Sequence, residues 1–538
     1  MGVPQLSPTP MPHAPTPSTR DRVARAYACR MSAAAEDAFI PPAEEVDNGD
    51  EARYSDKSGT YTKCIQQLNI GLVDLAAYDT FKKALDSGRT KLFNNIVLGG
   101  TRLLNGPQGG LAFDLQCLDS SQFRVPPAPA LASEEYATEL IELYWASLLR
   151  DIPFTEYATN SVAAQAAAEL STLPTYKGPK AGNQVTADLL FRGNFPGETL
   201  GPYLSQFLLK DACFGAMPFT QRYTTFQPNT DFMLDPVTFQ DVQNGQPSGQ
   251  SLTTQALAYL YNGRGLCAFT HNDVLYQAYL TAYLVLQTLK GINCAVADNP
   301  APSNPGLPYS SGNPHDSWKT QQGFTTLGPP DIASTMAAVA SEALKSVWYQ
   351  KWYIHLRHRP ESGGALVYLA KTGQNTTQGR PSPTVINSQA VQASFTRNNS
   401  YFLSQAFPEG SPAHPAYPTG HGTVAGACIT VLKFFYDGTY NIPNPLVSTN
   451  NGATPVSYTG SDAGQLTVNG ELNKLAHNIS FAHGIHAGIH WRSDTDESIR
   501  LGEAVALSVL RDRIRTYNEK FTVQLTKVDG TIATISNE

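Results

Sequence analysis

Apolar residues recur every three or four positions along much of this 538-residue chain, which is the spacing of helices that bury one face. The clearest run is EEYATELIELYWASLLR at 134–150, where acidic residues open the pattern and an arginine closes it. The same periodicity predicts helices over 253–291, 331–359, 420–437, 473–490 and 494–517. Residues 437–470 predict loops or short strands. The pattern therefore indicates a mainly helical protein.

Capping residues and prolines set the expected limits of these helices. Asp331 is placed to cap one helix at its start, and Pro360 to end it, because proline lacks the N–H that a helix interior needs. Asp494 and Glu497 have the spacing of a capping box. Stretches rich in proline, glycine or polar residues predict irregular structure at 1–20, 296–330 and 371–400. We expect the first of these, residues 1–20, to be a Pro-rich arm.

Composition narrows the classes of function. Only 15% of the residues are charged, against about 25% in an average globular protein, and the net charge is −7. A weakly charged surface resists association poorly, so we expect a homo-oligomer. The chain has no basic patch, which argues against a nucleic-acid partner. No apolar run approaches the ~20 residues of a membrane span and no signal peptide is recognisable, so we expect a soluble protein whose compartment stays open.

The seven cysteines are scattered along the chain without CxxC spacing, so a cysteine zinc site is not expected. Their odd number favours reduced, mostly buried thiols over a disulfide framework. They lie at positions 29, 64, 117, 213, 267, 294 and 428.

Candidate chemistry is concentrated in the last third of the chain, which holds eight of the eleven histidines. Lys351 and Arg359 are eight positions apart, slightly over two helical turns, so both can face one side of the expected helix. Arginine presents a planar fork to an oxyanion, and lysine presents a mobile point charge. The pair predicts an oxyanion site; the alternative, and the commoner fate of such residues, is a solvated basic helix end.

The segment Pro418-Thr419-Gly420-His421 is a stronger indication of the same site. Gly420 lets the backbone approach a ligand closely, and the helix that follows points its free N–H groups at an anion. Thr419 adds a hydroxyl donor. His421 lies in the first turn, where it can exchange a proton with an anion oxygen. The alternative is an ordinary turn with a surface histidine.

A third group of residues, His483, His486 and His490, lies at i, i+3 and i+7 of an expected helix and so on one face. Imidazoles at this spacing can converge on zinc, but a packed amphipathic face is the commoner arrangement. Small neighbours such as Gly484 and Ala487 indicate that another helix or a ligand approaches this face closely.

Together these segments resemble the vanadium-dependent haloperoxidases, which share their site with a superfamily of acid phosphatases. The similarity is greatest to the bromoperoxidases of algae and cyanobacteria. It covers roughly residues 180–538 well and the first 130 weakly. The segments that carry it are FRGNFPGETLGPYLSQF at 191–207, EALKSVWYQKWYIHLRHRPESGG at 342–364, FPEGSPAHPAYPTGHGTVAGACITVLK at 407–433 and LTVNGELNKLAHNIS at 466–480.

The resemblance implies a cofactor, vanadate, and a set of residues that bind it. His490 would bind vanadium(V) through a ring nitrogen. Lys351 and Arg359 would hold the vanadate oxygens together with the Thr419 hydroxyl and the Gly420 amide. Lys351 and His490 would in this way also take part in catalysis.

The resemblance also implies how peroxide and halide are handled. His421 would be the acid–base partner of hydrogen peroxide, and His414 would contribute to catalysis from the halide pocket. Trp348 would line the same pocket. It stands where the bromoperoxidase type often has arginine, and chloroperoxidases place a tryptophan in the corresponding region, so the halide preference stays open.

The implied reaction oxidises a halide with hydrogen peroxide to hypohalous acid, which halogenates small organic acceptors; bromide is expected ahead of iodide or chloride. The implied fold is mainly α, with two four-helix bundles in the core, long loops and a few short strands. We expect residues 181–538 to form the catalytic domain and residues 21–180 an N-terminal helical region that contacts other subunits. The oligomer would range from a dimer to a dodecamer.

One position departs from the family pattern, because Gly484 stands where the family has an arginine six residues before the vanadium-binding histidine. Losing one charge-assisted hydrogen bond, worth about 1.5–3 kcal/mol, would weaken vanadate binding about ten- to a hundredfold. His483, His486 and Arg492 are candidates to replace it. Two alternatives to a haloperoxidase follow: an acid phosphatase that uses His490 as nucleophile, and a non-catalytic oligomeric protein with a decayed site.

Overall fold

Helices are the main regular element of the structure, a computed structural model that describes residues 19–289, 308–374 and 380–538. The strands of this part of the chain are short and pair only as antiparallel two-stranded sheets. The predicted mainly helical fold, with helical bundles, long loops and few strands, is therefore confirmed. The division at residues 20 and 180 stays a prediction, and most of the Pro-rich arm lies outside the described residues.

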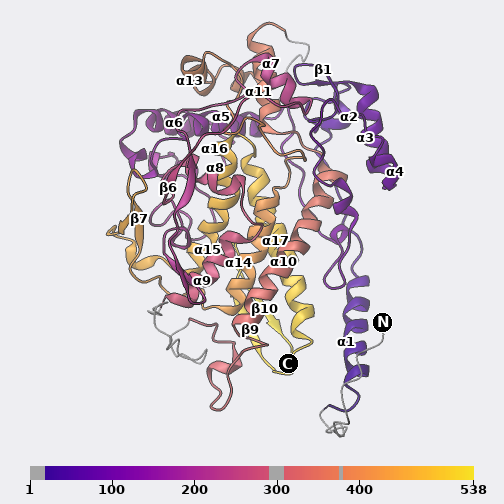
Figure 1. Ribbon diagram of the computed structural model, residues 1–538, viewed down its shortest axis with the longest axis vertical. Helices are drawn as coiled ribbons and strands as arrows, with labels where there is room; N and C mark the ends of the chain where they lie inside the picture. The colour runs from indigo at the N-terminus through magenta and orange to yellow at the C-terminus, as the bar shows by residue number, and fades with distance from the viewer. Residues whose placement is uncertain (1–18, 290–307, 375–379) are drawn as a thin grey trace.

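The centre of the molecule is a bundle of long, nearly parallel helices (Figure 1). Helix α14 packs against α10 and α17, and α9 and α15 complete its surroundings. Nearly every residue of α14 is buried, which explains its continuous apolar sequence. The bounds are α9 Gln277–Thr288, α10 Pro329–Tyr349, α14 Gly420–Phe435, α15 Val468–His477 and α17 Arg492–Ile514.

Two glycines allow α14 and α17 to approach each other closely. A Cβ atom on Gly426 would overlap the carbonyl oxygen of Ile499, and one on Gly502 would overlap the carbonyl oxygen of Thr423. Side chains at these two positions would force the helices apart, so the contact requires glycine on both. This close packing fixes the start of α14 against the start of α17, where the site described below is formed.

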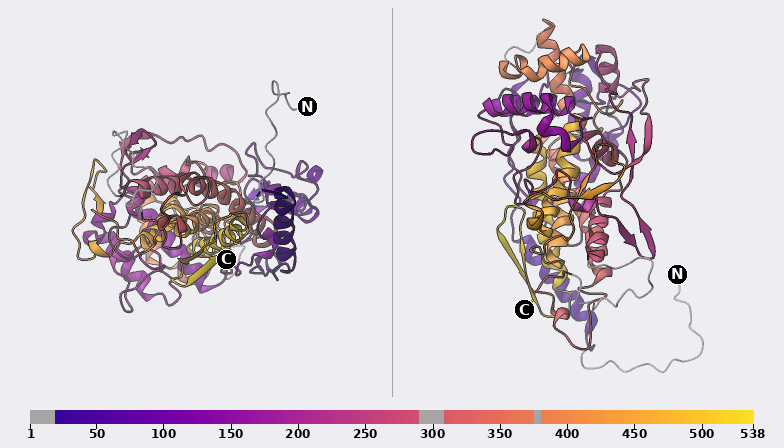
Figure 2. Two further views of the ribbon diagram at one scale, coloured as in Figure 1. Left: turned by 90° about the horizontal axis from the view of Figure 1, so that it is seen from below. Right: turned by 90° about the vertical axis from the view of Figure 1, so that its left-hand side faces the viewer.

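A second group of helices lies across one end of the bundle, as Figure 1 and the right-hand view of Figure 2 show. Helix α5 is its centre and packs against the other members of the group and against α16. The bounds are α5 Glu134–Leu148, α6 Ser161–Thr172, α11 Pro360–Lys371, α12 Pro383–Ile386, α13 Gln389–Asn398 and α16 His483–Ala487.

The remaining elements cover the outside of these two groups. Helix α1 stands apart from the body of the molecule and buries none of its residues (Figure 1). The helices are α1 Arg22–Ala38, α2 Asp50–Arg53, α3 Leu75–Ser87, α4 Thr90–Phe93, α7 Pro236–Gln243 and α8 Gly263–His271. The paired strands are β1 Gln67–Asn69 with β2 Leu72–Val73, β3 Ala212–Phe214 with β4 Met217–Phe219, β5 Tyr223–Phe226 with β6 Thr254–Ala258, β7 Leu446–Ser448 with β8 Pro455–Ser457, and β9 Thr522–Thr526 with β10 Ile532–Ser536.

The helix predicted over 331–359 has different limits. It begins at Pro329, ends at Tyr349 and continues as one π-helical turn, Gln350–His355. Leu356 then adopts a left-handed conformation with φ 42°, which ends the turn. Pro360 does not end a helix but begins α11, where its missing N–H costs nothing. Lys351 and Arg359 therefore do not lie on one helix, contrary to the prediction.

The helix predicted over 473–490 was also wrong in its limits. Helix α15 is followed by a π-helical turn, Asn478–Ala482, and by the short α16. Gly488, at φ 80°, ends α16, so His490 lies beyond it. The three histidines consequently do not lie along one helical face.

Three further expectations are corrected by local capping. The pattern over 253–291 divides into β6, α8 and α9, because the Asn262 side chain accepts from the Gly265 amide and starts a new helix there. Residues 371–400 contain α12 and α13, whose starts are capped by Ser382 and Ser388. The last helix begins at Arg492, and Asp494 lies inside its first turn.

The cysteine prediction is wrong at one position, because Cys213 is disulfide-bonded. Cys29, Cys64, Cys117, Cys267 and Cys428 are free thiols, and Cys294 lies outside the described residues. Among the described residues, no helix combines the length and the apolar character needed to cross a bilayer.

Candidate oxyanion site

His490 is buried at the turn between α16 and α17, and both of its ring nitrogens have a partner. Nδ1 lies 2.8 Å from a carboxylate oxygen of Asp494, and Nε2 lies 2.9 Å from Nη1 of Arg359. A guanidinium can only donate, so Nε2 carries the lone pair and Nδ1 carries the proton. Burial, Arg359 and Lys351 all hold the pKa of His490 well below its usual range. The ring is therefore neutral, with its lone pair directed into the site.

Asp494 is the residue that fixes this tautomer. Its carboxylate is fully buried and accepts from the His490 ring, from the Trp491 amide at 3.0 Å and from Nη1 of Arg357 at 2.8 Å. Arg357 is in turn paired with Glu139 at 2.9 Å. Burial raises the pKa of Asp494, and the Arg357 charge opposes that rise. The sequence reading placed Asp494 only as a helix cap; its spacing of four from His490 was the available signal.

Arg359 precedes α11 and is completely enclosed. Its guanidinium donates from Nε to the His414 carbonyl at 2.9 Å and from Nη1 to the Ile489 carbonyl at 2.8 Å. Nη2 lies 3.0 Å from Nδ1 of His414. Burial lowers the pKa of Arg359 to about 10, so the side chain keeps its charge at neutral pH. These contacts hold a cation beside the lone pair of His490.

Lys351 lies on the π-helical turn after α10, with no exposed surface. Its Nζ donates to the carbonyls of Pro415 and Ala416, at 2.8 and 2.9 Å. Burial, followed by the Arg359 charge, holds its pKa well below the usual range. The Lys351 amine is therefore held against the chain segment that immediately precedes the Pro418–His421 turn.

Thr419 and Gly420 form the start of α14, as the sequence predicts. The Thr419 hydroxyl lies 3.3 Å from Nε2 of His490 and does not cap its own helix. Gly420 is the first residue of this sixteen-residue helix, whose opening N–H groups have no helical partner. A Cβ on Gly420 would lie 3.2 Å from the ring of Trp348, so a larger residue would crowd the site wall.

His421 follows in the first turn and is about one-third exposed. Its Nε2 lies 3.2 Å from both carboxylate oxygens of Asp273, and its ring centroid lies 4.8 Å from that of His483. Sequence reasoning missed Asp273. It lies 148 positions earlier, just after α8, and no local pattern singles it out.

A cavity of about 400 Å³ opens onto these residues. Gly420, His421 and His490 line it, together with Trp348 and His414, whose ring centroids are 4.8 Å apart. Lys351, Arg359 and Thr419 are buried behind its wall, in contact with residues that line it. The structure thus brings all eight predicted site residues around one cavity.

Position 484 cannot hold the arginine of the family pattern. A Cβ on Gly484 would lie only 2.8 Å from the Cβ of His490, so any side chain there would displace that histidine. Two of the three suggested replacements also face elsewhere. His486 bonds to the Ala146 carbonyl at 3.0 Å and packs on Phe191, whereas His483 lines the cavity.

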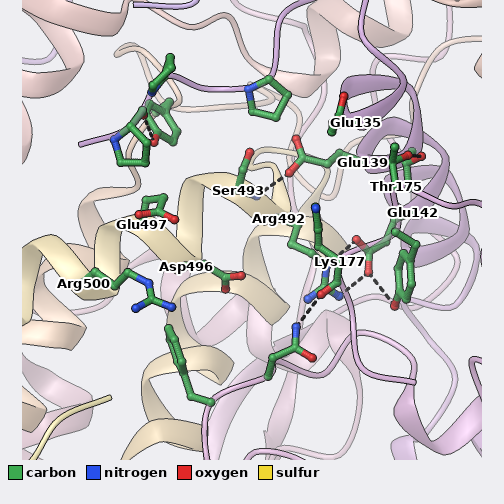
Figure 3. A pocket seen from close by; sticks show the side chains of 18 of the residues that line it. Glu135, Glu139, Glu142, Thr175, Lys177, Arg492, Ser493, Asp496, Glu497 and Arg500 are labelled. Carbon is green, nitrogen blue, oxygen red and sulfur yellow. Dashed lines mark hydrogen bonds and ion pairs between the residues drawn. The ribbon is translucent and has the colours of Figure 1, made fainter. Parts of the chain in front are cut away.

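Arg492, the third suggested replacement, lines a second and larger cavity of about 520 Å³, which His490 does not line (Figure 3). Its Nε lies 2.9 Å from Glu142, with which it forms a buried ion pair. This cavity also contains Asp496 and Arg500. Arg492 is therefore a structural ion-pair partner and does not reach the oxyanion site.

The donor set fits a tetrahedral oxyanion such as vanadate. Two buried cations, a hydroxyl and the N–H groups of a helix start can hold oxygens, and an imidazole lone pair can bind the central atom. The three histidines do not form a zinc site, because His486 bonds to the Ala146 carbonyl and does not line the cavity that His483 and His490 share. Within the described residues, no group of three or more histidine, cysteine or acidic side chains is placed to hold a metal ion by itself.

Comparisons with known proteins identify the family that this chain resembles. Residues 332–519 match the family model of the VCPO second helical-bundle domain. The chain is 31% identical to a vanadium-dependent bromoperoxidase of Corallina officinalis, over 86% of this chain and 88% of that protein. It is 29% identical to one of Ascophyllum nodosum, over 96% and 93%.

A solved structure extends the similarity to the whole fold. The homohexameric structure of the second vanadate-dependent bromoperoxidase from Ascophyllum nodosum superposes with a TM-score of 0.89 and 26% identity. The match covers 99% of this chain and 94% of that one. The described residues before position 130, in which the sequence resemblance is weak, therefore share the fold as well.

Proposed function

The chain belongs to the vanadium-dependent haloperoxidases, and from this premise we propose that it oxidises bromide with hydrogen peroxide, using vanadate held on His490. One observation carries the proposal. The neutral ring of His490 has its lone pair at Nε2, between the Arg359 guanidinium and the Thr419 hydroxyl. When bound, vanadate supplies a Lewis-acidic centre that activates peroxide without a change of oxidation state.

The residues around His490 would hold the cofactor by charge and by direct hydrogen bonds. Arg359, together with Lys351 in its protonated form, would neutralise oxyanion charge in this buried site, where each charge counts for more than in solution. Thr419 and the Gly420 amide donate to the oxygens. Asp494 keeps the proton on Nδ1, so that Nε2 is always available as a ligand.

His421 would exchange a proton with hydrogen peroxide. It is the most accessible of the site imidazoles, and its Nε2 is held by Asp273. The carboxylate orients the ring and stabilises it when it is protonated. A proton taken from peroxide at the cavity mouth can therefore stay on His421 until a product oxygen takes it back.

Trp348 and His414 would form the halide subsite. Trp348 is half-buried and is fixed by a 2.9 Å bond from Nε1 to the Asn105 carbonyl, and His414 lies against it. This wall combines the polarizable rings of Trp348 and His414 with the nearby Arg359 guanidinium, which suits a large, weakly hydrated anion. The product, hypobromous acid, would leave through the same cavity and halogenate small organic acceptors.

The test is halogenation of an organic dye by purified protein with peroxide and each of bromide, chloride and iodide, before and after vanadate is added. We expect activity only with vanadate, highest with bromide, and none in His490→Ala. Lack of halide oxidation by vanadate-loaded protein would refute the proposal. Hydrolysis of a phosphate ester by the vanadate-free protein, without halide oxidation, would instead support the acid phosphatase alternative.

The protein is proposed to act as a homo-oligomer. Helix α1 exposes Val23, Tyr27 and Met31 at four-residue intervals, with 84%, 63% and 52% of each side chain accessible. Such a stripe is typical of a helix that packs on another subunit. The similar Ascophyllum nodosum protein is a homohexamer. Light scattering is expected to show an oligomer, and Tyr27→Glu to weaken it.

A further inference from the structure

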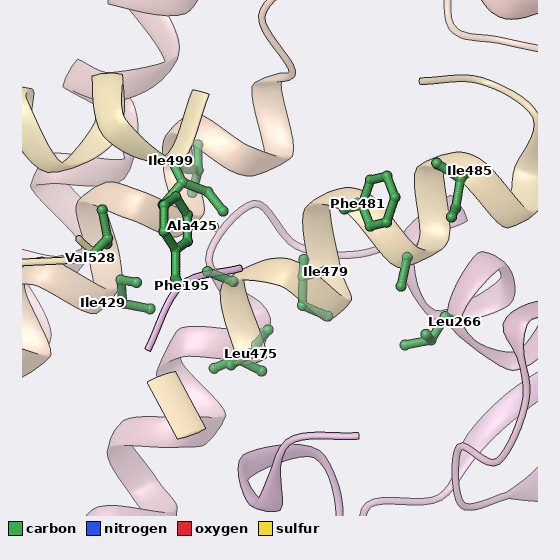
Figure 4. Packing of buried hydrophobic residues seen from close by; sticks show 14 of the residues in the cluster. Phe195, Leu266, Ala425, Ile429, Leu475, Ile479, Phe481, Ile485, Ile499 and Val528 are labelled. Atoms are coloured by element: carbon green, nitrogen blue, oxygen red, sulfur yellow. The ribbon is translucent and has the colours of Figure 1, made fainter. Parts of the chain in front are cut away.

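The π-helical turn before α16 changes the hydrogen bonding of His483. In a regular helix, the His483 amide would donate to the carbonyl of Ile479, four residues back. Here it donates to Asn478, five residues back. The Ile479 carbonyl instead accepts from Nδ1 of the His483 ring. Figure 4 shows the neighbouring side chains of this segment, Ile479, Phe481 and Ile485, within the hydrophobic core, which holds the irregular turn in place.

The hydrogen bond to the Ile479 carbonyl determines which ring nitrogen of His483 carries the proton. A carbonyl oxygen can only accept, so Nδ1 of His483 carries the proton and Nε2 carries the lone pair. No partner for Nε2 is found in the part of the chain that the structure describes. The residue is 2% exposed, yet it lines the same cavity as His421 and His490. Burial and then His421 hold its pKa well below the usual range, so the ring is neutral.

His483 therefore differs from the hydrogen-bond donors around the oxyanion site. Lys351, Arg359 and the Gly420 amide can only donate hydrogen bonds, and they favour any tetrahedral oxyanion without regard to its protonation. A fixed acceptor at the edge of the same cavity favours an oxygen that carries a hydrogen. A bare oxyanion oxygen in that position would face the His483 lone pair and be repelled.

We propose that His483 is a specificity-determining residue, which accepts a hydrogen bond from a protonated oxygen of the bound oxyanion and so selects vanadate and phosphate over sulfate. At neutral pH inorganic vanadate and phosphate carry protons and sulfate carries none, although sulfate has nearly the same size and shape. The inference rests on the proposed function, because it places the oxyanion on His490. It replaces the idea of a protonated His483 acting as a substitute cation.

The expected effect is that of one neutral hydrogen bond. Removing the acceptor would lower the affinity for vanadate and phosphate about fivefold and leave the affinity for sulfate unchanged or higher. The ratio of phosphate to sulfate affinity is the diagnostic quantity, since a merely structural role of His483 would weaken both anions alike.

The experiment is calorimetric titration of vanadate-free protein with inorganic vanadate, phosphate and sulfate. The variants are His483→Phe and His483→Met, which lack an acceptor, and His483→Gln, which restores one. His486→Phe is the matched control, because it alters the same short helix without facing the cavity. We expect the phosphate-to-sulfate ratio to fall about fivefold or more in His483→Phe and His483→Met, and to stay near the wild-type value in the other two.

An unchanged ratio in a folded His483→Phe or His483→Met protein would overturn the inference. So would an equal fall in the ratio in His486→Phe. Failure of the proposed function is a separate result: wild-type protein would then bind no vanadate and show no halogenation. If wild-type protein halogenates with vanadate while the ratio does not respond to residue 483, only the inference about His483 fails.

Discussion

Replacing Asp494 by asparagine tests the central feature of the site, the fixed tautomer of His490. The carboxylate accepts from three donors: the His490 ring, the Trp491 amide and Arg357. Asparagine keeps the shape, but it has one acceptor oxygen and an amide that can only donate. At least one of the three donors then loses its partner, and the His490 ring is free to place its proton on Nε2.

The expected losses of vanadate affinity and of protein stability follow from the contacts that Asp494 makes. Losing support from a hydrogen-bonded carboxylate behind a metal-binding histidine typically costs ten- to a hundredfold in affinity. Protein stability should also fall, because Arg357 keeps only Glu139 as a charged partner in a fully buried position. Breaking such a buried pair costs about 3–5 kcal/mol, and the remaining Glu139 contact should bring the loss towards the lower end.

The assay is calorimetric titration of vanadate into vanadate-free wild-type and Asp494→Asn protein, with urea unfolding measured in parallel. Glu139→Gln is the matched control, because Glu139 contacts Arg357 on its other side and does not touch His490. We expect Asp494→Asn to lose both stability and affinity, and Glu139→Gln to lose mainly stability. A folded Asp494→Asn protein with wild-type vanadate affinity would refute the reasoning about the tautomer.

Three further predictions concern packing, proton transfer and pH. Gly426→Ala should lower the free energy of unfolding by about 2–3 kcal/mol, because the new methyl group overlaps the Ile499 carbonyl; an unchanged urea midpoint would contradict this. Asp273→Asn should lower kcat about a hundredfold with an unchanged Kd for vanadate, since it acts on His421 alone; equal losses in both would assign it to cofactor binding. Burial raises the pKa of Asp496 from 3.8 to about 6, and so the folded state binds an extra proton between these values and stability falls as pH rises through them. Asp496→Asn should therefore add about 1–3 kcal/mol of stability above pH 6 and nothing near pH 4; thermal unfolding across this range measures it, and a gain that does not depend on pH would reject the assignment.

The sequence by itself predicted the helical character of the chain and the three segments that form the site. The periodicity of apolar residues identified α5, α14 and α17, because a helix that buries one face must repeat at that spacing. Candidate chemistry was recognisable for a similar local reason. Thr419, Gly420 and His421 are consecutive residues at the start of one helix, so a local sequence motif is enough to identify them.

Only the tertiary structure decided how these groups are oriented. Asp273 and Glu139 lie far from their partners in sequence, and no periodicity relates residues that meet through folding alone. The two π-helical turns could not be predicted from the sequence either, because one extra residue in a turn leaves the apolar pattern almost unchanged. The extra residue nevertheless rotates every side chain that follows it in the helix. That rotation turns His483 towards the cavity, and with the end of α16 at Gly488 it leaves His490 facing Arg359 and Thr419, which is the physical basis of the site.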